Sequence, residues 1–160
     1  MICISTYASS ANIQQSQRKA TMHQEIKQGV YVILGSIVLL GLSFIVYFGL
    51  FRMFQLILNP EGHFGFVMFL RIGYGIILIL LAFLNYRTKT AEWLKASIMS
   101  AGLGTFLIGL TVSLYETPIL AYAIVFVTLS VTAVYLFKTQ QKWFHYIPIG
   151  MSLLAIWLYI

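Results

Sequence analysis

Five apolar stretches, each about as long as a membrane's hydrocarbon core is thick, set the strongest limit on how this chain folds. They run approximately over residues 29–51, 65–85, 96–114, 118–137 and 143–160. A helix needs about 20 apolar residues to cross that core. Because 60% of the residues are hydrophobic and only 9% are charged, lipid is a better solvent for the chain than water. The sequence therefore predicts an all-α integral membrane protein, a five-helix transmembrane bundle.

The fifth stretch is the least regular of the five. It has 18 residues, from Trp143 to Ile160, and carries His145 and Pro148 near its start. A stretch of this length either spans the membrane narrowly or lies partly in the interface. We predict that it spans.

Basic residues predict the orientation of the bundle, because cytoplasmic segments beside membrane spans are enriched in Lys and Arg. Eight of the 10 basic residues fall on one side of the predicted topology: Arg18, Lys19, Lys27, Arg87, Lys89, Lys95, Lys138 and Lys142. Arg52 lies on the other side, and Arg71 lies within the second stretch. We therefore expect a cytoplasmic amino terminus and a carboxy terminus outside. An odd number of crossings keeps all three basic clusters on one face, which favours a fifth span.

The first 28 residues differ in composition from the rest of the chain. They are rich in Ser and Gln and show neither helical nor strand periodicity. They also lack the apolar core of a secretory signal. We predict a disordered polar cytoplasmic tail over residues 1–28, followed by a transmembrane helical domain over residues 29–160.

Small side chains recur at every fourth position of the third apolar stretch: Ser97, Ala101, Thr105, Gly109 and Ser113. Within lipid, helices associate through close backbone approach and hydrogen bonds, and small or hydroxylated residues allow both. A step of four residues keeps these positions near one face of a helix. We interpret them as a helix-packing face and place the third helix at the centre of the bundle. Two alternatives are contact between copies of the chain and the lining of a water-filled path.

Arg71 is the charged residue that lies well inside a predicted span. An Arg at the centre of a membrane helix costs about 2.5–3.5 kcal/mol on insertion scales. One interpretation is structural: the side chain extends to the headgroups, or it pairs with Glu116 or Glu61. The other is an outer polar site that binds an anion through the guanidinium. Its candidate residues are Arg71, Tyr74, Glu116, Tyr115 and Tyr122, with Glu61 and His63 as further candidates.

The sequence offers little for catalysis, metal binding or nucleic-acid binding. The topology separates the three histidines, His23, His63 and His145, and no ligand spacing or Cys cluster is present. The four acidic residues supply no carboxylate pair inside a span. The net charge of +6 is explained by the basic clusters beside anionic headgroups. We predict no enzymatic activity, cofactor, metal or nucleic-acid partner.

These observations favour an accessory, adaptor or immunity-type membrane protein that acts through helix packing. Its partners are the bilayer and either further copies of the chain or another membrane protein. The alternative is a small transporter or permeation component for an anionic or amphiphilic solute, with Arg71 near its outer entrance. Compact loops favour a prokaryotic cytoplasmic membrane. No motif in the sequence is specific enough to assign a family.

Overall fold

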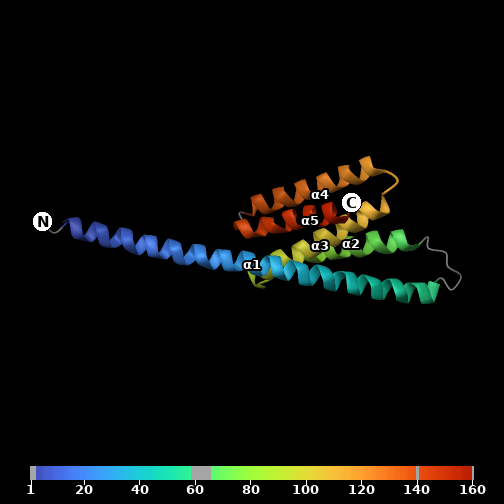
Figure 1. Cartoon of the computed structure of the whole chain (residues 1–160), viewed down its shortest axis with the longest axis horizontal. Helices are drawn as coiled ribbons and strands as arrows, with labels where there is room; N and C mark the ends of the chain where they lie inside the picture. Colours follow the sequence, from blue (N-terminus) through green and yellow to red (C-terminus); the bar gives the residue numbers. More distant parts are fainter. Residues whose placement is uncertain (1–2, 59–65, 140, 160) are drawn as a thin grey trace.

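The computed structural model describes residues 3–58, 66–139 and 141–159, and the side chains of residues 22–57, 66–139 and 141–158. In these residues every regular element is helical. The elements in chain order are α1 (Cys3–Leu58), α2 (Phe66–Asn85), α3 (Glu92–Ser113), α4 (Pro118–Lys138), the 3-10 helix η1 (Trp143–Tyr146) and α5 (Ile147–Tyr159). Figure 1 shows α2 to α5 side by side with one half of α1, so the predicted helical bundle is confirmed.

Four of the helices are long and apolar enough to cross a membrane. They cover Met22–Ile57, Phe66–Asn85, Glu92–Ser113 and Pro118–Lys138. This agrees with the prediction of a membrane-embedded protein. The fifth, α5, has 13 residues and is about 20 Å long at a rise of 1.5 Å per residue. It falls short of a hydrocarbon core of about 30 Å, so the fifth full span stays a prediction.

Helix α1 begins much earlier than the first apolar stretch. It runs without interruption from Cys3 to Leu58, so residues 3–28 are helical where the sequence led us to expect a disordered tail. Gln, Lys, Arg, Glu, Ala and Met in this segment have favourable helix propensities. Extending an existing helix is also easier than nucleating a new one, and the apolar segment supplies the nucleus. Figure 1 shows this part of α1 reaching well beyond the other helices.

Helix α3 lies at the centre of the bundle and packs against α1, α2 and α5. Small side chains on several of its faces let these neighbours approach closely. Its buried residues are Ala96, Ser97, Met99, Ser100, Ala101, Gly102, Leu103, Gly104, Thr105, Leu107, Ile108, Gly109 and Leu110. Helix α4 packs on this core through a narrower face formed by Ala121, Val125, Thr132 and Leu136.

Two glycines, Gly75 in α2 and Gly102 in α3, allow these two helices to pack closely. A Cβ atom at Gly102 would lie 2.9 Å from the backbone oxygen of Leu78, and one at Gly75 would lie 2.9 Å from the Cα atom of Phe106. Both distances are shorter than van der Waals contact, and the opposing atoms belong to the backbone. The close contact of these two helices therefore depends on the missing side chains.

The described connections lie at the two ends of the bundle (Figure 1). Residues 86–91, 139 and 141–142 lie at the end beyond which the first half of α1 extends. We call this the basic end, because Arg87, Lys89, Lys138 and Lys142 belong to these residues or border them. The end of α1, the start of α2 and the α3–α4 connection lie at the other end, called the distal end below.

Candidate functional site

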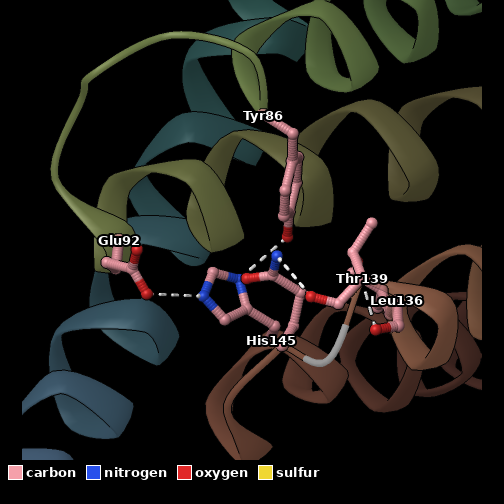
Figure 2. A network of polar contacts seen from close by, with 6 residues as sticks. Tyr86, Glu92, Leu136, Thr139 and His145 are labelled. Carbon is pink, nitrogen blue, oxygen red and sulfur yellow. Dashed lines mark hydrogen bonds and ion pairs between the residues drawn. The ribbon is translucent and has the colours of Figure 1, made fainter.

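A buried histidine at the basic end joins three segments of the chain (Figure 2). His145 belongs to η1, Glu92 is the first residue of α3, and Tyr86 directly follows α2. The Nδ1 atom of His145 lies 2.9 Å from the Tyr86 hydroxyl, and its Nε2 atom lies 3.4 Å from Glu92 Oε2. The His145 side chain is 0% exposed, whereas that of Glu92 is 45% exposed. The imidazole ring of His145 thus links three places in the chain: the residue after α2, the first residue of α3 and the 3-10 helix η1.

The hydrogen-bond partners of His145 favour one tautomer of its ring. The partner of Nε2 is a carboxylate oxygen of Glu92, which accepts a hydrogen bond, so we assign the ring proton to Nε2. In the neutral ring, Nδ1 then accepts from the Tyr86 hydroxyl. Burial raises the pKa of Tyr86 far above its ordinary value, and the nearby Tyr135 and Glu92 add to the effect, so the hydroxyl keeps its proton.

The surroundings of His145 favour a structural role for the cluster. Both ring nitrogens are occupied, and the Phe144 ring packs on the imidazole with centroids 4.6 Å apart. Tyr86 also meets Tyr135 of α4 edge to face, at 6.0 Å between centroids. A substrate would have to displace one of these partners to reach the ring. We interpret the cluster as a structural clamp: its hydrogen bonds hold α2, α3 and η1 together at the basic end of the bundle.

Sequence reasoning did not find this cluster. The sequence presents His145 as a histidine near the start of the fifth stretch, without the spacing of a metal ligand. Among the described residues no group of three or more His, Cys, Asp or Glu side chains could hold a metal. Its partners lie 53 and 59 positions away along the chain. The available signal was topological, because Tyr86, Glu92 and His145 all flank span ends on the same predicted side.

A second polar site lies where α1, α2 and α3 meet, toward the distal end. A cavity of about 180 Å³ is lined there by Phe44, Tyr47, Arg71, Tyr74, Thr105, Ile108, Gly109 and Val112. Arg71 is half-buried, and its aliphatic part rests on α3, where a Cβ atom at Gly109 would come within 3.1 Å of Arg71 Cγ. The absence of a side chain at Gly109 therefore makes room for the arginine.

Below Arg71, three hydroxyl groups connect α1, α2 and α3. The Tyr74 hydroxyl donates to the backbone carbonyl of Ser43 at 2.9 Å. The Ser43 hydroxyl lies 2.8 Å from Thr105 Oγ1, and this contact is buried. Because each side chain comes from a different helix, the network holds all three helices in register. Tyr74 and Thr105 also form part of the cavity wall, so the cavity has polar groups at its base.

The structure divides the predicted outer site into two places. Arg71 and Tyr74 share the cavity between α1, α2 and α3. Tyr115 and Tyr122 line a second cavity of about 380 Å³ between α3 and α4, and Val112 lines both. Within the described residues, Glu116 accepts a hydrogen bond from Tyr115 at 2.9 Å and forms no ion pair with Arg71. The other two candidates, Glu61 and His63, lie outside the described residues.

Four of the five small residues predicted as a packing face lie toward α1 or α2: Ser97, Ala101, Thr105 and Gly109. Ser97 lies against Gly35 of α1, Thr105 bonds to Ser43, and Gly109 meets Arg71. Ala101 lines an apolar groove between α1 and α2, and Ser113 is half-buried at the distal end. The spacing of four residues thus coincides with the side of α3 that the first two helices cover.

Comparison with known proteins adds no functional assignment: no family model, curated protein or solved structure matches this chain.

Proposed function

We propose that this chain is a multi-pass membrane protein without enzymatic activity that serves as an accessory, adaptor or immunity-type component. It acts by packing its helices against another membrane protein or against a second copy of itself. In this proposal the protein resides in a prokaryotic cytoplasmic membrane, with its amino terminus in the cytoplasm and α5 as the last crossing.

The use of hydroxyl groups inside the bundle supports this function. Ser43, Tyr74 and Thr105 bond to one another. Five further hydroxyls bond to the carbonyl one turn earlier in their own helix: Ser36, Ser97, Thr111, Thr128 and Thr132. In the described residues, the buried hydroxyls without a partner are those of Ser100, Ser113 and Ser152. A path for a polar solute needs available polar groups along its length, and few remain here.

The outward-facing surfaces of α1 and α4 expose large apolar side chains that a partner helix could contact. Helix α4 exposes Ile119, Phe126 and Phe137 at 86%, 73% and 78% of their surface, and α1 exposes Val38 and Ile45 at 68% and 69%. Lipid covers such faces in an isolated membrane protein. A second membrane helix can cover them equally well, because packing and close approach, rather than a hydrophobic gain, drive helix association in lipid.

Cysteine accessibility tests the closed bundle. In a Cys3→Ser background, Thr105→Cys is expected to resist a water-soluble maleimide in intact membranes, because Thr105 is buried and bonded to Ser43. Glu116→Cys is expected to react, because this residue is exposed in the α3–α4 connection. Reaction of both Thr105→Cys and Arg71→Cys from the same side would contradict the closed bundle.

Labelling of both Thr105→Cys and Arg71→Cys from one side would support a second candidate function. This function is a small transporter or permeation component for an anionic or amphiphilic solute. The cavity that contains Arg71 favours this alternative, because a guanidinium in a partly buried site suits an anionic group. The hydroxyls of Thr105 and Thr111 would then line the route from the distal end.

The proposed orientation has its own test. Thr88 and Thr117 are exposed in connections at opposite ends of the bundle. In intact cells an impermeant maleimide is expected to label Thr117→Cys, whereas Thr88→Cys reacts only after the membrane is permeabilised. The reason is that Thr88 lies between Arg87 and Lys89, and basic segments stay cytoplasmic. The reverse labelling pattern would invert the topology.

A further inference from the structure

Arg52 and Arg71 lie away from the basic end, and the fold places them at similar distances from the distal end of the bundle. Arg52 lies six residues before the end of α1, and Arg71 lies five residues after the start of α2. Both are thus about 8–9 Å from the helix ends at a rise of 1.5 Å per residue. Because α1 and α2 are antiparallel neighbours at the distal end, these cations occupy similar depths (Figure 1).

Arg71 lines a cavity on the surface between these helices, and Arg52 contacts one of the aromatic rings that line it. Its volume is about 400 Å³, and its lining consists of Tyr47, Phe48, Phe51, Val67 and Arg71. The guanidinium carbon of Arg52 lies 5.5 Å from the centroid of the Phe48 ring, in a cation–π contact. One cation therefore lines the cavity, and the other lies over a ring that also lines it. We call this place the two-arginine crevice.

An apolar groove lies deeper between the same two helices. It has a volume of about 370 Å³ and shares Tyr74 with the smaller cavity that contains Arg71. The other residues that line it are Leu39, Leu42, Ser43, Val46, Ile77, Leu78, Leu81, Ile98, Ala101 and Gly102. The smaller cavity also shares Tyr47 and Arg71 with the crevice. It therefore lies between the crevice, which is near the end of the helices, and the apolar groove, which is nearer the membrane centre.

We propose that the two-arginine crevice binds an anionic phospholipid from the leaflet at the distal end. The lipid phosphate lies between Arg71 and Arg52, and an acyl chain follows the apolar groove toward the membrane centre. A guanidinium binds phosphate oxygens through two parallel hydrogen bonds. The bound anion also offsets part of the cost of holding Arg71 at this depth. This lipid site is separate from the proposed partner-binding function, since it requires neither a protein partner nor solute passage.

Lipid competition on the full-length chain tests the proposal. The protein in mild detergent is mixed with equal amounts of phosphatidylglycerol and phosphatidylcholine, and native mass spectrometry measures the ratio of the two bound lipids. We expect wild type to favour phosphatidylglycerol by about fivefold or more, as befits charge-assisted hydrogen bonds. Arg71→Gln and Arg52→Gln are expected to bring this ratio close to one.

Arg87→Gln is the matched control, because Arg87 is exposed at the basic end and should leave the preference unchanged. Arg52 is also exposed, so its variant tests the site even where Arg71→Gln alters folding. An unchanged preference in Arg52→Gln, or an equal loss in Arg87→Gln, would overturn the proposal. Effective competition by glycerol phosphate, which has no acyl chain, would also overturn it in favour of a site for soluble anions.

Discussion

Replacing Gly102 with alanine is expected to lower the free energy of unfolding of the bundle by about 1–3 kcal/mol. The added Cβ atom would lie 2.9 Å from the backbone oxygen of Leu78 and 3.1 Å from the Cβ atom of Ala82. A flexible side chain could rotate away, but a backbone carbonyl within α2 moves only with its helix. The substitution therefore forces α2 away from α3. Unfolding in a detergent titration, followed by far-UV circular dichroism, measures the effect.

The matched control is Gly73→Ala in α2. A Cβ atom at Gly73 meets nothing within 4 Å, so this substitution adds helix propensity without a clash. We expect it to leave stability unchanged or to raise it by up to about 1 kcal/mol. Equal shifts in the two variants would show that propensity rather than packing determines the result, and would contradict the close contact of α2 with α3.

Replacing His145 with alanine is expected to lower the free energy of unfolding by about 2–4 kcal/mol. The side chain is 0% exposed, so its removal leaves a cavity beside Phe144. It also removes a hydrogen-bond partner from both Tyr86 and Glu92. Of these two, Tyr86 is the more buried and has less access to water, so it accounts for most of the polar cost. The same detergent titration measures this change.

Two further variants separate the contributions at this cluster. Tyr86→Phe removes one hydrogen bond and keeps the ring, so it should cost about 1 kcal/mol. His23→Ala changes an exposed histidine of α1 and should have little effect. If His145→Ala were as stable as wild type, the cluster would not act as a clamp at the basic end.

Local sequence patterns were sufficient to predict the helical class and the approximate extents of the four long apolar helices. The reason is that lipid leaves few options: each backbone polar group must be satisfied within its own segment, so a long apolar run becomes a helix. Such patterns were less informative for residues 3–28, where polar composition indicated disorder but α1 is continuous. There, helix propensity and propagation from the apolar segment outweighed composition.

The candidate sites depended more strongly on tertiary structure. Arg71 and Tyr74, which the predicted topology places toward the same outer side, line one cavity. Tyr115 and Tyr122 were assigned to the same site, but they line a different cavity between α3 and α4. The position of a residue along a span indicates its depth in the membrane. It does not indicate which neighbouring helix the residue faces.

The sequence by itself therefore determined the helices, their apolar character and the gathering of basic residues in segments that alternate along the chain. Each of these follows from local composition and from the length of a helical turn. Only the tertiary structure decided which faces meet: Gly102 against Leu78, Arg71 against Gly109, and His145 between Tyr86 and Glu92. These pairings depend on the rotation of each helix about its axis. That rotation is set by close packing between residues far apart in the chain.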